Sequence, residues 1–128
     1  EAKRILEIPE EKEIGIKELL QKTRNDLGLK TVVITDGKDG SYSFDGTDAW
    51  KLAEFPGERV EATGAGDAFA TATCAALFHG KILPEAMVWG SINGASVVHE
   101  VGPQAGLLTL EEIEKRRNSR PDFQATKI

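Results

Sequence analysis

The residues with the clearest potential for chemistry form one short run, TGAGDAF, at residues 63–69. Two glycines within three residues let the backbone turn tightly and approach a ligand without obstruction from side chains. The free amides of Ala65, Gly66 and Asp67 would lie at the start of the following helix, where unpaired N–H groups and the helix dipole favour an anion. The run therefore predicts an anion-binding loop.

Asp67 has a different part in this hypothesis, because a carboxylate repels an anion. Its position makes chemical sense if it faces a hydroxyl group that attacks the anion, since a carboxylate can take the proton of an attacking hydroxyl. The pattern thus points to phosphoryl transfer. A purely structural interpretation stands beside it, because Asp is among the preferred residues at helix starts and glycine-rich loops often precede helices.

Two other phosphate-binding motifs are missing from the sequence. It contains no GxxxxGK[ST] run, so it has no P-loop motif. The run that begins at Gly64 lacks the third glycine of a dinucleotide-binding fingerprint and has Phe69 in its place. Both observations disfavour the commonest alternatives for a glycine-rich turn before a helix.

The sequence around this loop predicts an α/β layout, in which strands follow one helix and precede others. Apolar spacing, β-branched residues and turn residues predict elements as follows: a helix at 9–29, strands at 31–35, 41–45 and 50–55, and helices at 67–78, 84–99 and from Thr109 onward. Thr109 and Glu112 have the spacing of a capping box. The tail at 119–128 shows no pattern and is expected to fray.

Small residues are concentrated in two of the predicted helices. The helix at 67–78 is mostly Ala and Thr, and the helix at 84–99 carries Gly90 and Gly94. Small side chains let another element approach closely, so we expect these helices to be tightly packed.

The composition of the chain disfavours several kinds of partner and location. The chain has 128 residues and a net charge of −5, which argues against a nucleic-acid partner or an anionic membrane surface. No apolar run approaches the ~20 residues of a membrane span, and no signal peptide is visible. A lone cysteine, Cys74, fits a reducing compartment, so we expect a cytoplasmic protein.

At TGAGDAF the chain resembles the PfkB-type carbohydrate kinases, the ribokinase-like family. TDGKDG at 35–40 looks like that family's T-x-G-x-x-G turn beside the nucleotide. SINGAS at 91–96 and GPQAG at 102–106 resemble its C-terminal helix and the loop over the adenine, and TLEEIE at 109–114 resembles its closing helix. The resemblance implies an incomplete ribokinase-like fold, the C-terminal part of a three-layer α/β/α domain.

The resemblance also implies an activity, the ATP-dependent phosphorylation of a sugar hydroxyl. Asp67 matches the family's catalytic base. Gly64, Ala65 and Gly66 match its anion hole, which would hold charge that develops on the transferred group. Magnesium would come with the ATP rather than from a cage of protein ligands.

The nucleotide and cation positions follow from the same resemblance. Thr35 and Gly37 match the turn near the nucleotide, Asn93 matches a position near the adenine or ribose, and Gly102 lies in the loop over the adenine. The family commonly has Asp-Thr at residues 61–62, where many members form a monovalent-cation loop. Here Glu61 stands in that place and offers an oxygen as a candidate potassium ligand.

Family members are well over twice as long, and their N-terminal half carries the sugar-binding residues and a small lid. We therefore expect residues 1–128 to be the C-terminal ATP-binding portion of a kinase, inactive alone because catalysis needs both substrates held together. The expected partners are a sugar, ATP, and either the N-terminal half or a second copy. Three alternatives stay open: a non-catalytic nucleotide-binding module, an inactive structural fragment, and a nucleoside kinase.

Overall fold

The helices and strands are arranged around a small antiparallel sheet. The structure, a computed structural model, describes residues 1–57, 63–99 and 106–128. In chain order the elements are α1 (Ala2–Ile5), α2 (Ile16–Asp26), β1 (Val32–Thr35), a 3₁₀ turn (Gly37–Asp39), β2 (Ser41–Phe44), β3 (Ala49–Leu52), α3 (Ala65–Phe78), α4 (Leu83–Val98), α5 (Leu110–Ser119) and β4 (Thr126–Lys127).

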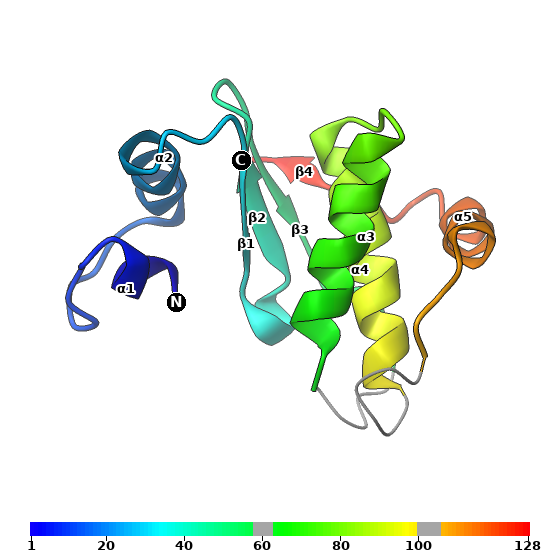
Figure 1. Cartoon of the computed structure of the whole chain (residues 1–128). Coiled ribbons are helices and arrows are strands. Elements are labelled where there is room, and N and C mark those ends of the chain that lie inside the picture. The colour runs from blue at the N-terminus through cyan, green and yellow to red at the C-terminus, as the bar shows by residue number, and fades with distance from the viewer. Residues whose placement is uncertain (58–62, 100–105) are drawn as a thin grey trace.

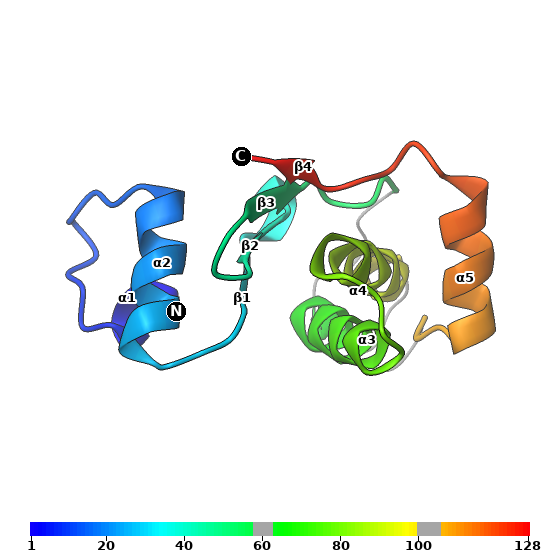
Figure 2. The same ribbon diagram turned by 90° about the horizontal axis from the view of Figure 1, so that it is seen from above.

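The elements are stacked in layers, as Figures 1 and 2 show. Helices α1 and α2 lie on one side of the sheet, and α3 and α4 lie on the other. Helix α5 lies outside α4, on the side away from the sheet (Figure 2). The expected three-layer α/β/α order is therefore confirmed.

The sheet has four strands in the order β1-β2-β3-β4, each antiparallel to its neighbour. The register pairs Val32 with Phe44 and Ser43 with Trp50. The chain leaves the ladder after Leu52, because the Phe55 N–H turns to the buried Ser91 Oγ of α4 at 3.0 Å. The strand expected at 50–55 is therefore shorter at its end than predicted.

The first predicted helix is wrong in its N-terminal half. Helix α2 begins at Ile16 after Gly15, and residues 9–15 form a turn and irregular chain. The Nζ atom of Lys3 donates hydrogen bonds to the carbonyls of Glu10 and Lys12, at 3.0 and 2.8 Å. A distant lysine thus binds backbone carbonyls of this segment, which the local acidic and proline pattern does not reveal.

The prediction that the C-terminal tail frays is also wrong. Strand β4 pairs with β3, with Lys127 opposite Trp50, and the Ile128 N–H donates to the carbonyl of Ala49 at 2.9 Å. The ring of Phe123 packs edge-on against Phe55 with centroids 5.0 Å apart. Long-range contacts order the tail, so no local periodicity marks it.

Helix α4 is the centre of the core. Its residues from Ala86 to Val98 are all buried, as expected for a helix that is apolar around its whole circumference. A Cβ atom on Gly90 would lie 2.2 Å from Thr73 Oγ1 of α3, and one on Gly94 would lie 3.1 Å from the Ala65 carbonyl oxygen. The predicted close packing of these helices is confirmed. Among the helices that the structure describes, none has both the length and the apolar character of a membrane span.

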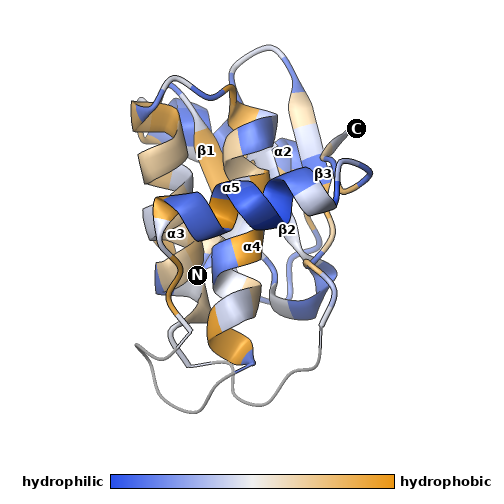
Figure 3. Cartoon of the chain, turned by 90° about the vertical axis from the view of Figure 1, so that its right-hand side faces the viewer, coloured by the Kyte–Doolittle hydropathy of each residue, from blue (hydrophilic) through white to orange (hydrophobic). Residues whose placement is uncertain are grey.

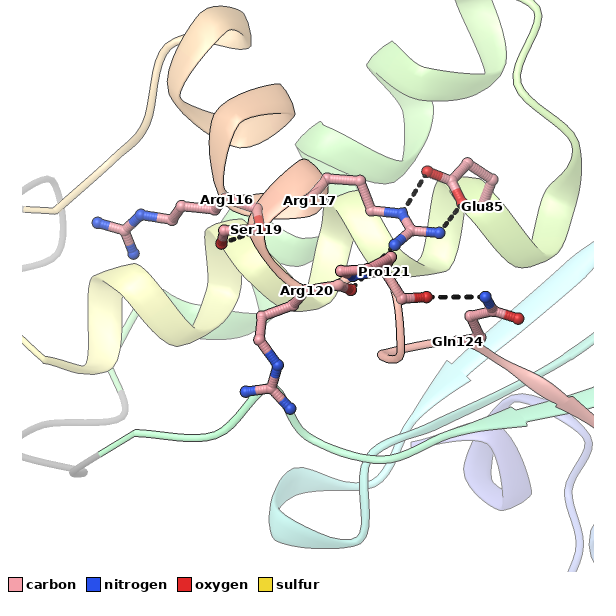
Figure 4. A network of polar contacts seen from close by, with 7 residues as sticks. All are labelled: Glu85, Arg116, Arg117, Ser119, Arg120, Pro121 and Gln124. Carbon is pink, nitrogen blue, oxygen red and sulfur yellow. Dashed lines mark hydrogen bonds and ion pairs between the residues drawn. The ribbon is translucent and has the colours of Figure 1, made fainter.

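Helix α5 covers α4 with one face and presents a mainly hydrophilic face outward (Figure 3). Ile113 is the one residue of α5 whose side chain is buried. At its end, Arg117 forms a bidentate ion pair with Glu85 of α4, at 2.7 and 3.1 Å, and donates to the Arg120 carbonyl at 3.0 Å (Figure 4). These contacts attach α5 to α4 just before the chain returns to the sheet as β4.

Candidate active site

The predicted anion loop has the expected backbone geometry. Gly64 is the N-cap of α3 and has φ 84°, a left-handed conformation that favours glycine. The Ala68 N–H donates to the Gly64 carbonyl at 2.9 Å and closes the first turn. The amides of Ala65, Gly66 and Asp67 have no acceptor within the helix, because the first N–H groups of any helix lack one. This end of α3 is therefore suited to an anion.

Asp67 lies in the first turn of α3 and is exposed. The N-cap position belongs to Gly64, and no side chain caps the helix there. A simple N-cap role for Asp67 therefore does not explain its presence. A negative side chain in the first turn is favoured by the helix dipole, and its exposure leaves the carboxylate accessible to an incoming hydroxyl.

A cavity of about 210 Å³ lies beside this helix end. It is formed by the turn between β1 and β2, the chain after β3, the start of α3 and the middle of α4. The lining residues are Thr35, Gly37, Gly40, Ser41, Glu54, Ala65, Gly66, Phe69, Ser91, Gly94 and Ala95. The structure thus brings Thr35 and Gly37 to one cavity with Ala65 and Gly66, although the two pairs are far apart in the sequence.

The turn between β1 and β2 is held close to β3. Gly37 has φ 53° within the 3₁₀ turn, and the Asp36 N–H donates to the Gly40 carbonyl at 2.8 Å. Gly40 has φ 92°, and a Cβ atom there would lie 2.0 Å from the Leu52 carbonyl oxygen. Only glycine fits at residue 40, so the turn that lines the cavity is fixed by backbone contact.

Asn93 lies on α4 with 4% of its surface exposed and does not line this cavity. Its Nδ2 donates to the Ala68 carbonyl at 2.9 Å, and its Oδ1 accepts from the Leu108 N–H at 3.0 Å. The side chain therefore joins α3 to the segment that precedes α5. Direct contact of Asn93 with a nucleotide stays a prediction.

Two of the predicted site residues, Glu61 and Gly102, lie outside the described residues. Sequence reasoning missed Glu54 and Ser91, which line the cavity. Ser91 is the first residue of the SINGAS run and Glu54 lies within the strand predicted at 50–55, but neither position carried a predicted role in the site. Within residues 1–57, 63–99 and 106–128, no group of three or more His, Cys, Asp or Glu could hold a metal ion.

Comparison with known proteins identifies the family. A sequence model described as pfkB family carbohydrate kinase matches residues 1–110. The chain belongs to the pfkB family of carbohydrate kinases. Among curated pfkB-related proteins, inositol 3-kinase of Zea mays is 36% identical over 97 residues, and 5-dehydro-2-deoxygluconokinase of Clostridium perfringens is 35% identical over 92 residues.

These matches cover 69% and 70% of this pfkB-family chain but 25% and 27% of the two relatives. The chain therefore spans about a quarter of their length. The solved ribokinase of Thermotoga maritima superimposes with a TM-score of 0.75 at 26% identity, over 89% of this chain and 37% of that one. A putative ribokinase II of E. coli, solved in complex with ATP and Mg²⁺, gives a TM-score of 0.69 at 29% identity, over 81% and 32%. The chain thus has part of the ribokinase fold.

Proposed function

We propose that the protein to which this chain belongs transfers a phosphoryl group from ATP to a hydroxyl of a sugar, and that residues 1–128 supply its nucleotide site, anion hole and general base. The observation that carries the proposal is the meeting of the β1–β2 turn and the N-terminus of α3 at one cavity. Relatives named for inositol and 5-dehydro-2-deoxygluconate kinase activity support a sugar-type acceptor.

The cavity fits part of a nucleotide. Its volume of about 210 Å³ is below the ~300–1,000 Å³ of pockets that enclose a whole drug-sized ligand. The amides of Ala65 and Gly66 at the helix end would hold phosphate oxygens, and Thr35 and Gly37 would border the rest of the nucleotide. ATP, when bound, supplies the phosphoryl group, and Mg²⁺ would be held mainly through its phosphates, as this ion usually is.

Each residue of the loop has one task in this mechanism. Gly64 turns the chain so that the amides of Ala65 and Gly66 point at the anion, and they stabilise charge that develops on its oxygens. Asp67 accepts the proton of the sugar hydroxyl while the hydroxyl oxygen attacks phosphorus. An involvement of Glu61 with potassium and of Gly102 with adenine belongs to the same proposal.

The substitution Asp67→Asn tests this assignment in the complete protein. The substitution preserves the size of the side chain and removes the proton acceptor. Turnover should therefore fall by roughly 10²–10⁴-fold, while ATP binding is retained. Asp26→Asn, at the exposed end of α2, is the matched control and should leave turnover unchanged. Near-normal phosphorylation of sugars by the Asp67→Asn protein would exclude Asp67 as the general base.

A further inference from the structure

Asn93 is a buried polar residue of α4 whose side chain binds backbone at both of its polar ends. Its Nδ2 donates to the Ala68 carbonyl of α3, and its Oδ1 accepts from the Leu108 N–H. The residue is 4% exposed, and it does not line the cavity. An amide enclosed in this way acts on the segments that it joins.

The first turn of α3 is held against α4 at two places. Gly94 brings α4 so close that a Cβ atom on it would lie 3.1 Å from the Ala65 carbonyl oxygen. One residue earlier on α4, Asn93 binds the Ala68 carbonyl at 2.9 Å. Asp67 lies between these two contact points and directly precedes the second. Asn93 therefore restrains the end of the turn that carries the Asp67 carboxylate.

The bond from Asn93 is additional to the bonds that make the helix. Helix geometry already pairs a carbonyl inside α3 with the N–H four residues later, so Asn93 uses the second lone pair of the Ala68 oxygen. The Leu108 N–H binds only the amide oxygen, which turns the nitrogen toward α3. Ile92 and Ala95, close by on α4, are buried and apolar. Packing alone would be satisfied by another apolar side chain at residue 93, without the cost of burying an amide.

We propose that Asn93 is a positioning residue for phosphoryl transfer: through the Ala68 carbonyl it fixes the place at which the Asp67 carboxylate meets the attacking hydroxyl. This inference rests on the proposed function, since it takes Asp67 to be the general base. A general base must lie within hydrogen-bond distance of the proton that it accepts, and a misplacement of about 1 Å can cost on the order of 10²-fold in rate. No contact between Asn93 and the nucleotide is required.

A double-mutant cycle in the complete protein tests the proposal. Asn93→Asp preserves the size of the side chain and its acceptor for Leu108, but it places an oxygen against the Ala68 carbonyl; Asn93→Ala removes both bonds. Each should lower kcat by about 10–100-fold. The KM for MgATP should change by less than about threefold, because Gly94 still holds the Ala65 end of the turn.

In the Asp67→Asn background the same two substitutions should lower kcat by less than about threefold, because the base that they displace is already absent. A loss of folded protein would instead lower kcat by the same factor in both backgrounds. Thr73→Val is the matched control, because it removes another buried hydrogen bond of α3, from Oγ1 to the Phe69 carbonyl at 2.8 Å. It should leave kcat unchanged.

Equal losses in the two backgrounds, or an unchanged kcat in both Asn93 variants, would overturn the proposal. A raised KM for MgATP with unchanged kcat would also overturn it, since that result assigns Asn93 to direct nucleotide binding. Near-normal turnover of the Asp67→Asn protein by itself would refute the proposed general base. The failure of the proposed function is thus distinguishable from the failure of this inference.

Discussion

Gly64 and Gly66 are glycines for different physical reasons. Gly64 has φ 84°, so a side chain there would strain the backbone. Gly66 lies inside α3, outside the left-handed region, and a Cβ atom on it would meet nothing within 4 Å. The fold therefore does not require glycine at position 66. We propose that the close approach of a ligand to the helix end, which the proposed function requires, is the reason for it.

The substitution Gly66→Ala separates these two requirements. Alanine is a better helix residue by roughly 1 kcal/mol, so the free energy of unfolding should stay the same or rise. A methyl group at the mouth of the anion loop should nevertheless weaken MgATP binding by at least about tenfold. Thermal unfolding and calorimetry on the same samples measure both effects.

Gly15→Ala provides the matched control, because a Cβ atom there also meets nothing within 4 Å and the residue is remote from the cavity. It should leave MgATP affinity unchanged. Full affinity in the Gly66→Ala protein would mean that phosphate does not approach this residue.

At the scale of elements, α5 has the most completely defined helix start. Thr109 accepts from the Glu112 N–H at 3.3 Å, and the Glu112 carboxylate accepts from the Thr109 N–H at 2.7 Å and from its hydroxyl at 2.8 Å. The predicted capping box is thus confirmed. The Thr109 backbone N–H, then its hydroxyl, holds the pKa of Glu112 below its ordinary value.

The capping box should make stability depend on pH. Because the pKa of Glu112 is lower in the folded chain, its contribution is fully present above the ordinary pKa of 4.5 and is lost as pH falls through the lowered value. Unfolding measured between pH 6 and pH 3 should show a smaller loss for Glu112→Gln than for the wild type. Glu111→Gln, outside the box, should follow the wild type, and identical curves for all three would contradict the prediction.

Gly57, which follows β3, lies against His99 at the end of α4. A Cβ atom on Gly57 would lie 1.9 Å from Nε2 and 2.2 Å from Cε1 of His99, and His99 supplies all three nearest atoms. Gly57→Ala should therefore destabilise the fold by about 1–3 kcal/mol through overpacking.

The double variant Gly57→Ala with His99→Ala should recover most of that loss, because the three atoms nearest to the added Cβ all belong to the imidazole. A denaturant series over the two single variants and the double variant measures the coupling. Purely additive losses would show that the two residues do not touch in solution.

The sequence correctly predicted the elements that are determined by residues close together along the chain. Ala, Thr and Gly spacing predicted α3, α4 and their close contact, and Thr109 with Glu112 predicted the start of α5. The sequence did not reveal that Lys3 would bind the carbonyls of the segment before α2, or that Phe123 would bring the tail back to β3. Those features depend on partners distant along the chain.

The candidate site was predicted to a similar extent. TGAGDAF predicted the glycine turn at the start of α3, and T-x-G predicted the turn that lines the same cavity, while their anion and nucleotide roles stay predictions. Glu54 was missed because it belongs to no motif and reaches the cavity only through the path of the chain after β3. Asn93 was singled out by resemblance, and the structure shows that its amide joins two backbone segments.

For the molecule as a whole, the chain spans about a quarter of its curated relatives and 32–37% of the ribokinase-fold structures compared above. The cavity itself is lined from the β1–β2 turn to α4 by residues of this chain. Nucleotide binding can therefore be tested directly on these 128 residues. Phosphorylation of a sugar, and pairing with a second copy or another polypeptide, stay predictions for the complete protein.

The most direct test is a thermal melt of the chain, followed by the fluorescence of Trp50 and Trp89, with and without MgATP. A ligand that binds only the folded state raises the melting temperature, and at 100 times its Kd the gain is about 2.7 kcal/mol, or roughly 10 °C for a chain of this size. We predict a cooperative melt with that upward shift, reduced in Gly66→Ala. A cooperative melt that saturating MgATP leaves unmoved would contradict the nucleotide site.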